Sequence, residues 1–158
     1  MKLVKFFSLS LIVLLTLVSC GGGETPAPFN VYFDGDIIED KATITVNTVD
    51  EILSEMPFYF SIENESDNSF SVNITEKRNY DLTKFESNLC ISQCLPGNGE
   101  ETQVWTVDNL PSGFSQEILY HLKPVDPSTP AKGEVLFTVS NGDYSTSFTV
   151  IFDFPGIN

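Results

Sequence analysis

The stretch EVLFTVSNGDYSTSFTVIFDF, residues 134–154, places apolar residues at every second position on both sides of one turn. Val135, Phe137 and Val139 share a face in the first half, and every second residue of 148–154 does so in the second half. A period of two is typical of strands with one buried face. Asn141-Gly142 supplies the positive φ angles that tight hairpin turns require. The stretch therefore predicts a β-hairpin.

The same alternation recurs upstream, in ATITVNTV (42–49), FYFSIEN (58–64), SFSVNITE (69–76), QVWTVD (103–108) and QEILYHL (116–122). The turn formers ENESDNS (63–69) predict a hairpin connection between the second and third of these strands. VDEILSEM (49–56) offers at most one helical turn before Pro57. Because strands do not alternate with helices, an open α/β sheet is excluded. The prediction is an all-β, antiparallel β-sandwich of about 7–8 strands.

The N-terminus carries targeting information rather than fold information. Lys2 and Lys5 precede an apolar run of about 13 residues, a length that suits a signal peptide better than a membrane span. The run ends in LVSC (17–20), which resembles the lipobox of bacterial lipoproteins. The resemblance implies a signal peptide at 1–19 and acylation of Cys20. The alternatives are an uncleaved anchor, or an ordinary signal that a cysteine happens to follow.

The residues after Cys20 predict how the domain is attached. GGGETPAP (21–28) has the composition of a flexible tether, so we expect a lipidated tether at 20–28 and a β-sandwich domain at 29–158. Acyl chains would bind the lipid bilayer. Gly21 stands where an aspartate would favour inner-membrane retention in lipoproteins. The expected location is therefore the outer membrane, on its periplasmic face or at the cell surface.

The net charge of the chain limits the classes of partner that it can bind. The 158-residue chain has a net charge of −14, and without residues 1–19 it keeps six of its eight basic residues and all 22 acidic ones, giving −16. Nucleic-acid affinity comes from phosphate neutralisation by Lys and Arg, so a nucleic-acid partner is excluded. The acidic residues are spread along the chain, which favours a role in solubility.

Cys90 and Cys94 are the two thiols that lipid would not use. An even pair in an oxidising compartment favours a disulfide, which requires the segment between them to curl. A redox-active pair and a metal site are the alternatives. The spacing differs from the thioredoxin motif, and His121 is the one histidine available to a zinc site, which needs four ligands. We interpret His121 itself as a residue that packs or hydrogen-bonds at the surface.

Acidic residues offer two further kinds of candidate site. DGDIIED (34–40) offers oxygen ligands for calcium from the acidic residues Asp34, Asp36, Glu39 and Asp40, but it lacks the EF-hand loop order, so a polar turn is the favoured interpretation. The chain has no G-x-S-x-G or H-E-x-x-H motif. Adjacent acids such as Glu100-Glu101 point apart rather than form a glycosidase pair. No enzyme activity and no cofactor are expected.

Four segments together resemble an immunoglobulin-like β-sandwich domain of secreted Bacteroidetes proteins. They are FYFSIENESDNSFSVNITEKR (58–78), CISQC (90–94), LPSGFSQEILYHLKP (110–124) and KGEVLFTVSNGDYSTSFTVIFDF (132–154). The resemblance spans roughly residues 42–154 and implies the fold and secretion, but no particular activity. The chain departs from the pattern in its cysteine loop, which holds Ile91, Ser92 and Gln93 instead of aromatics, and in His121, which follows Tyr120 instead of preceding it.

These observations favour a membrane-anchored, non-enzymatic binding, adhesion or accessory module for an envelope protein or glycan. Sandwiches present recognition loops on a rigid scaffold. The candidate loops are ESNLCISQCLPGNGEE (86–101) and KPVDPSTPAKG (123–133). The alternatives are a structural spacer without a specific ligand and, least favoured, a carbohydrate-active enzyme.

Overall fold

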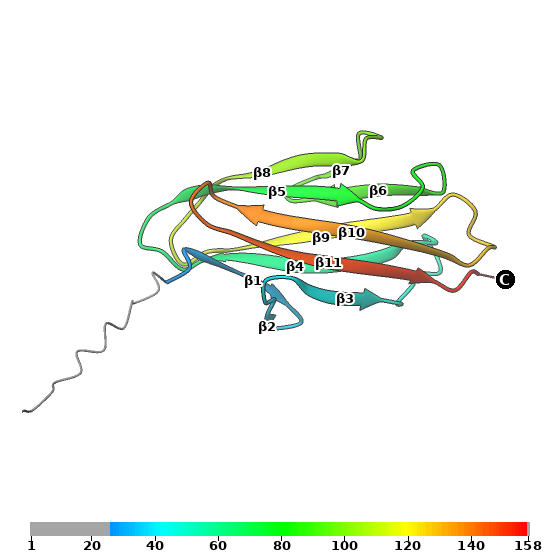
Figure 1. The fold of residues 1–158 in the computed structure, drawn as a ribbon, viewed down its shortest axis with the longest axis horizontal. Coiled ribbons are helices and arrows are strands. Elements are labelled where there is room, and N and C mark those ends of the chain that lie inside the picture. Colours follow the sequence, from blue (N-terminus) through cyan, green and yellow to red (C-terminus); the bar gives the residue numbers. More distant parts are fainter. Residues whose placement is uncertain (1–25, 158) are drawn as a thin grey trace, which may run out of the picture.

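The computed structural model describes residues 26–157, which form two packed β-sheets (Figure 1). The eleven strands are β1 (Phe29–Phe33), β2 (Asp36–Ile37), β3 (Ala42–Val46), β4 (Met56–Asn64), β5 (Phe70–Arg78), β6 (Phe85–Cys90), β7 (Cys94–Pro96), β8 (Thr102–Leu110), β9 (Ser115–Pro124), β10 (Ala131–Ser140) and β11 (Ser145–Phe154). None of the described residues forms a helix long and apolar enough to cross a membrane.

The first sheet has six strands in the order β2-β1-β4-β9-β6-β7, and the second has five in the order β3-β11-β10-β5-β8. Neighbouring strands are antiparallel except for β3 and β11, which pair in parallel from Ala42↔Phe148 to Phe152↔Val46. The core lies between the sheets. The predicted all-β, immunoglobulin-like sandwich is confirmed.

The core follows directly from the alternation in the sequence. Along β11, every second residue from Phe148 to Phe154 is buried, and along β4 the same holds from Met56 to Asn64. The phenylalanine rings of the two sheets meet in the middle: Phe60 and Phe148 lie 5.5 Å apart edge to face, and Phe58 and Phe137 lie 6.3 Å apart. Burial of these side chains is the main force that holds the sheets together.

The strand count exceeds the prediction because four strands were not recognised. The seven predicted strands are present, and the additional strands are β1, β2, β6 and β7. The last two overlap the stretch 86–101, for which the sequence predicts a loop. Three of the four are five residues long or shorter, so their alternation gave a weak signal.

The predicted hairpin between residues 58–64 and 70–76 is wrong. β4 belongs to the six-stranded sheet and β5 to the five-stranded sheet, so residues 65–69 cross from one sheet to the other. Asn64 holds this crossing. Its buried side chain donates to the carbonyls of Asn68 (2.8 Å) and Leu110 (2.9 Å) and accepts from the backbone N–H of Ser66 (2.9 Å).

The hairpin of β10 and β11 is present, but its turn differs from the expected one. The loop has four residues, 141–144, and Gly142 is its one residue with positive φ (98°). The Asn141 side chain instead accepts from the backbone N–H of Tyr144 (3.0 Å). Asparagine closes the turn by a local hydrogen bond, as it often does, without adopting positive φ.

The sandwich has two distinct ends (Figure 1). At the Phe29 end, β1 begins and the loops 65–69, 111–114 and 141–144 gather. At the opposite Phe154 end, β11 finishes beside the loops 47–55, 79–84, 97–101 and 125–130. The start and the finish of the described chain therefore lie at opposite ends of the molecule.

Candidate functional site

A disulfide closes the hairpin of β6 and β7 at the edge of the six-stranded sheet. Cys90 and Cys94 face each other in the strand register with their Cα atoms 3.9 Å apart and their sulfurs bonded. The turn of residues 91–93 provides the curl that the spacing required. Cys90 is buried and Cys94 is exposed. The predicted disulfide is thus present, within a hairpin rather than a loop.

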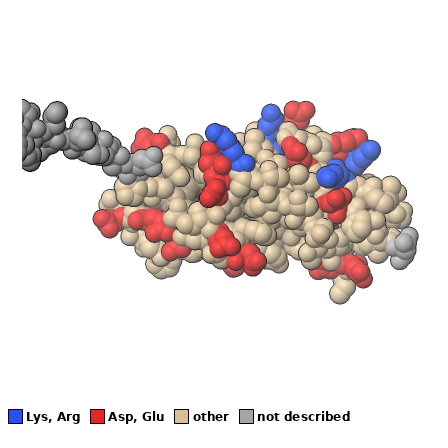
Figure 2. Space-filling view, turned by 60° about the horizontal axis from the view of Figure 1, so that its bottom comes forward, with Lys and Arg blue, Asp and Glu red and all other residues tan. Residues whose placement is uncertain are grey.

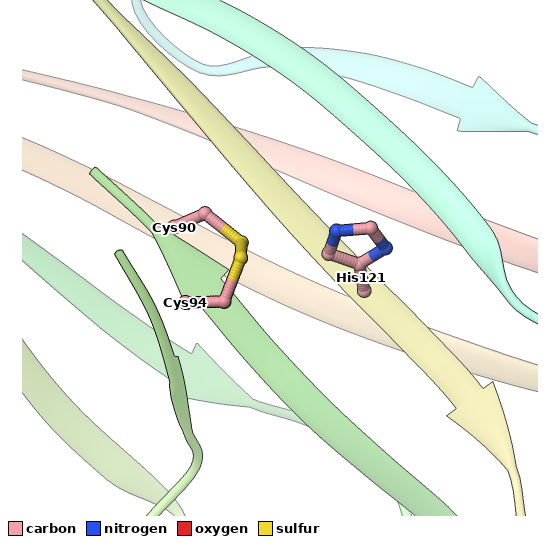
Figure 3. Close-up of side chains that lie close together, drawn as sticks. All are labelled: Cys90, Cys94 and His121. Atoms are coloured by element: carbon pink, nitrogen blue, oxygen red, sulfur yellow. A yellow bond between two sulfur atoms is a disulfide. The ribbon is translucent and has the colours of Figure 1, made fainter. Parts of the chain in front are cut away.

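His121 lies beside this disulfide (Figure 3). It belongs to β9, which pairs with β6, and one ligand atom from each of Cys90, Cys94 and His121 lies within 4.8 Å of the others. The other side of the ring meets Glu55, whose Oε1 is 2.6 Å from Nδ1, although the ring N–H is not aligned on that oxygen. His121 packs at the surface, half-buried, and neither its disulfide neighbour nor Glu55 could be predicted from the sequence.

The four acidic residues considered for calcium are dispersed. Asp34 occupies the turn between β1 and β2, with a positive φ of 52°, and Asp36 begins β2. Asp40 accepts hydrogen bonds from the backbone and the hydroxyl of Ser147, both at 2.9 Å, and these bonds lower the pKa of its carboxyl group. Within residues 26–157, these acids do not bring three ligand atoms together.

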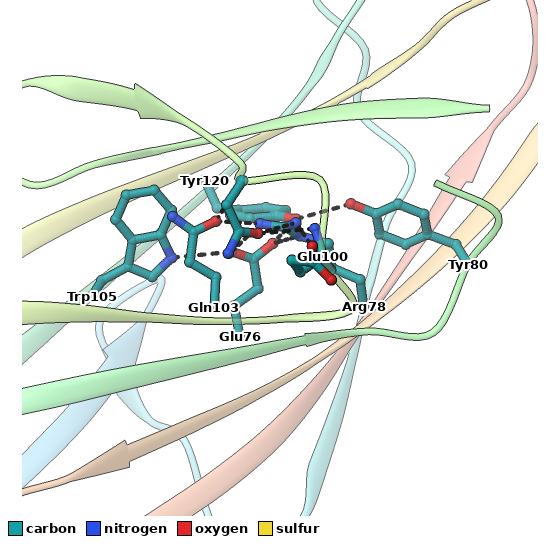
Figure 4. A network of polar contacts seen from close by, with 8 residues as sticks. Glu76, Arg78, Tyr80, Glu100, Gln103, Trp105 and Tyr120 are labelled. Carbon is teal, nitrogen blue, oxygen red and sulfur yellow. Dashed lines mark hydrogen bonds and ion pairs between the residues drawn. The ribbon is translucent and has the colours of Figure 1, made fainter. Parts of the chain in front are cut away.

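The most unusual feature of the interior is an ion pair between Glu76 and Arg78 (Figure 4). Both residues are on β5, two positions apart, so both point into the gap between the sheets. Arg78 Nε donates to Glu76 Oε1 at 2.6 Å and Nη2 donates to Oε2 at 3.1 Å. Their side chains are 2% and 1% exposed. Charged groups are buried in this way only when they are paired and hydrogen-bonded.

Every remaining polar position of this pair is occupied. The other Arg78 donors reach the Glu100 carbonyl (2.7 Å), Asn98 Oδ1 (3.2 Å) and Gln103 Oε1 (2.8 Å). The Glu76 carboxylate also accepts from Tyr120 and Trp105, in the contacts Tyr120 OH–Oε1 (2.6 Å) and Trp105 Nε1–Oε2 (3.1 Å). The guanidinium has five donor positions and the carboxylate about four acceptor positions, so neither has capacity left for a substrate.

The network joins parts of the chain that are distant in sequence. It links β5 and β8 of one sheet, Tyr120 of the other sheet, and the loop 97–101, which carries the chain from the disulfide hairpin into β8. Gly97 belongs to this loop, and a Cβ atom there would lie 2.7 Å from Arg78 Nη2. The network therefore fixes the path of the hairpin's return segment.

Burial changes the proton affinity of the groups around the pair. Burial raises the pKa of the Tyr120 hydroxyl well above its usual value, and the negative charge of Glu76 raises it further. Burial also raises the pKa of Tyr80, whose hydroxyl lies 3.5 Å from that of Tyr120. For Arg78, burial alone would lower the pKa, but the hydrogen bonds and charge of Glu76 raise it overall. Arg78 is therefore positively charged and both tyrosines are neutral at physiological pH.

The Phe154 end contains a cleft of about 420 Å³ between the loops 79–84 and 125–130. The lining combines apolar and basic side chains: Phe85, Pro124, Val125, Pro130, Lys84 and Lys132. Val125 is 58% exposed. Elsewhere on the surface, carboxylates are spread along the whole visible face with few basic side chains among them (Figure 2).

A second apolar feature lies at the same end. The turn 50–55 is closed by the backbone bridge between Asp50 and Glu55, and the Asp50 side chain accepts from the backbone N–H groups of Ile52 and Leu53 at 3.0 and 3.1 Å. The turn nevertheless leaves Ile52 94% and Leu53 53% exposed. It therefore presents two apolar side chains to solvent from an ordered backbone. The one helical turn considered for this segment is instead this bridged turn.

The lipidation site predicted at Cys20 lies outside the described residues. No protein-family model and no curated protein sequence matches the chain. Among solved structures, the N-terminal domain of PorA is similar over 82% of this chain and 99% of that domain, with a TM-score of 0.63 and 18% sequence identity.

Two adhesin structures are more distant in shape. One is CfaE, the adhesive subunit of the CFA/I fimbria of enterotoxigenic Escherichia coli. The match spans 80% of this chain and 48% of CfaE, with a TM-score of 0.43 and 10% sequence identity. The other is the collagen-binding domain of a Staphylococcus aureus adhesin. The match spans 82% of this chain and 99% of that domain, with a TM-score of 0.43 and 12% sequence identity. The likeness to the PorA domain shows that the chain shares its β-sandwich fold.

Proposed function

We propose that this protein is a lipid-anchored, non-enzymatic module of the bacterial envelope that binds a protein or glycan partner through its Phe154 end. Cys20 would carry the acyl chains, residues 20–28 would form the tether, and the outer membrane would be the site of attachment. The sequence motifs and the likeness to the PorA domain support a secreted sandwich of the Bacteroidetes type.

One observation supports the proposal: β1 begins at the end of the sandwich opposite the cleft and the turn 50–55. β1 begins at the Phe29 end, so a tether that precedes it leaves the sandwich there (Figure 1). The cleft lined by Val125 and the turn that exposes Ile52 and Leu53 are at the Phe154 end, which would face away from the membrane. Exposed apolar groups next to polar ones are typical of interaction sites.

The chemistry of this end favours binding over catalysis. Asp126 is the carboxylate in the cleft lining, and its oxygens accept hydrogen bonds from the hydroxyls of Ser128 (2.7 Å) and Thr129 (2.8 Å). These bonds lower the pKa of the Asp126 carboxyl group. A carboxylate used in this way stabilises a turn and is a weak base. The buried Glu76–Arg78 pair is likewise fully engaged.

The test compares two matched surface variants in cells that express the full chain. Val125→Ser combined with Ile52→Ser removes apolar side chains from the Phe154 end, whereas Phe114→Ser removes a 62% exposed side chain from the Phe29 end. Envelope proteins are captured by crosslinking, and purified chains are applied to a glycan array. We expect one partner that is retained by wild type and Phe114→Ser and lost by the double variant. Equal loss with Phe114→Ser, or no partner with any variant, would favour the spacer function instead.

Attachment is tested separately. Cells are grown with a labelled fatty acid, and label is expected in the wild-type chain and absent in Cys20→Ala. A labelled Cys20→Ala chain would contradict the lipoprotein assignment without affecting the partner test.

A further inference from the structure

The outer face of the six-stranded sheet brings together three side chains that are good ligands for soft metal ions. On β9, His121 is opposite Asn88 of β6, and Cys90 is the next β6 residue on the same face. Diagonal neighbours of this kind are within reach of each other in an antiparallel pair. Cys94 is placed opposite Cys90 by the β6–β7 register. The ligand atoms of Cys90, Cys94 and His121 all lie within 4.8 Å of one another.

Glu55 adds an independent observation that points to a metal ligand. In Figure 3, one ring nitrogen of His121 faces the two sulfurs and the other faces away. Nδ1 of the ring is 2.6 Å from Glu55 Oε1, and both side chains are largely shielded from solvent, at 15% and 12% exposure. Metal-binding histidines almost always have a carboxylate, carbonyl or water at the second ring nitrogen, which fixes the ring and raises its basicity. Glu55 lies within reach of Nδ1, and a small rotation of the ring would align its N–H on the carboxylate.

We propose that Cys90, Cys94 and His121 form a binding site for a thiophilic d10 cation, with Zn²⁺ as its representative, when the disulfide is reduced. Thiolate and imidazole are the ligands that such cations prefer. Two sulfurs and one nitrogen leave a fourth tetrahedral position, which solvent can fill because Cys94 is exposed. The proposal does not depend on partner binding at the Phe154 end.

A thiol reductant opens the disulfide by thiol–disulfide exchange. Two external thiols transfer two electrons and two protons to the Cys90–Cys94 bond and become a disulfide themselves, while Cys90 and Cys94 become thiols. Exposed Cys94 is the sulfur open to attack. Binding of Zn²⁺ then releases the two thiol protons to solvent. Closed disulfide and bound metal are therefore mutually exclusive states of the same two sulfurs.

The hairpin should survive this exchange. The ring closed by the disulfide is short, so by the chain-entropy relation it contributes little to the stability of the fold. The backbone pairing of β6 with β9 extends from Phe85 to Cys90 and does not involve the sulfurs. The reduced ligands thus stay near the positions that the structure gives them.

The experiment uses the full chain and Zn²⁺ alone. Protein is reduced anaerobically with a phosphine, which does not offer a competing thiol, and is titrated against a chromophoric zinc chelator. Reduced wild type is expected to retain one Zn²⁺ per chain, and the oxidised form none. Glu55→Gln should weaken binding roughly 10- to 100-fold, as is typical for loss of an outer-shell partner. His121→Ala should weaken it further, and Asn88→Ala, the register neighbour of His121, should leave it unchanged.

Two outcomes would overturn the proposal. One is reduced wild type that loses all Zn²⁺ to the chelator while circular dichroism shows an intact β fold. The other is equal affinity in wild type and His121→Ala, which would mean that the two thiolates bind zinc without the imidazole. If His121→Ala does not fold, the Glu55→Gln variant and the comparison of oxidised with reduced wild type decide the question.

Discussion

Glu76 and Arg78 form a two-point ion pair inside the sandwich, with Nε 2.6 Å from Oε1 and Nη2 3.1 Å from Oε2, although both residues come from the same strand. The pair does not itself bridge the sheets. It provides a charged centre to which Tyr120 of the opposite sheet and the loop 97–101 attach. Each of the two buried charges therefore relies on the other for compensation.

Removing one charge of the pair should therefore lower the free energy of unfolding more than removing both charges does. Arg78→Met leaves Glu76 buried without its partner, and we expect it to lower the free energy of unfolding by about 3–5 kcal/mol. Glu76→Gln combined with Arg78→Met leaves no unpaired charge and should be less destabilised than the single variant. Lys77→Met, an exposed neighbour on β5, should stay within about 0.5 kcal/mol of wild type. Urea unfolding monitored through Trp105 measures all four proteins. A loss below about 1 kcal/mol in Arg78→Met would contradict the role of the pair.

The raised pKa of Tyr120 predicts a loss of stability in alkali. Above pH of about 10, the usual tyrosine pKa, the unfolded chain releases the Tyr120 proton while the folded chain retains it. The unfolded state then binds fewer protons, so the free energy of unfolding falls as pH rises. Urea unfolding between pH 8 and pH 11 should show a steeper fall for wild type than for Tyr120→Phe. Parallel curves for the two proteins would show that Tyr120 does not supply the effect.

The sheet crossing at Asn64 predicts a strong effect from a single amide. Asn64→Ala would remove partners from the Leu110 and Asn68 carbonyls and from the Ser66 N–H, and each buried group left unpaired costs about 1–3 kcal/mol. Asn73→Ala is the matched control, because Asn73 is exposed and its side chain accepts from the Thr106 hydroxyl (3.1 Å) at the surface. Thermal unfolding should separate the two variants clearly. Similar melting temperatures would mean that the crossing does not require the Asn64 amide.

The disulfide should matter locally more than globally. A chain with Cys90→Ser and Cys94→Ser is expected to lose no more than about 2 kcal/mol of unfolding free energy, because the closed ring is short. Amide exchange should accelerate at Leu95 on β7 and remain slow at Leu119 on β9. A global loss well above this value would show that the hairpin supports the whole sandwich.

Much of the fold could be predicted from the sequence because burial and alternation coincide in the long strands. The alternation of Val72 and Ile74 even extends to Glu76 and Arg78, so a buried charged pair was readable from position alone. β6 was missed because Ser87 interrupts its buried face between Phe85 and Leu89. Short strands with a polar residue at a core position resemble loops.

Which strands pair, and which residues become neighbours on adjacent strands, could not be predicted in the same way. Residues 58–64 and 70–76 look like the two arms of a hairpin, yet the chain crosses between sheets because Asn64 satisfies the backbone groups of the crossing. The proximity of His121 to Cys90 depends on the register of β9 against β6, and its proximity to Glu55 depends on the bridged turn before β4. Register is a property of the assembled sheet, not of either strand.

The parallel pairing of β3 with β11 has a consequence for how the protein is made. Ala42 pairs with Phe148, so an early strand of the domain obtains its neighbour only from the last one. During synthesis, which delivers the chain from its N-terminus, the edge N–H and C=O groups of β3 stay unpaired until β11 has emerged. A chain truncated before Phe148 would thus leave both edges of β3 unpaired, and completion of β11 covers one of them.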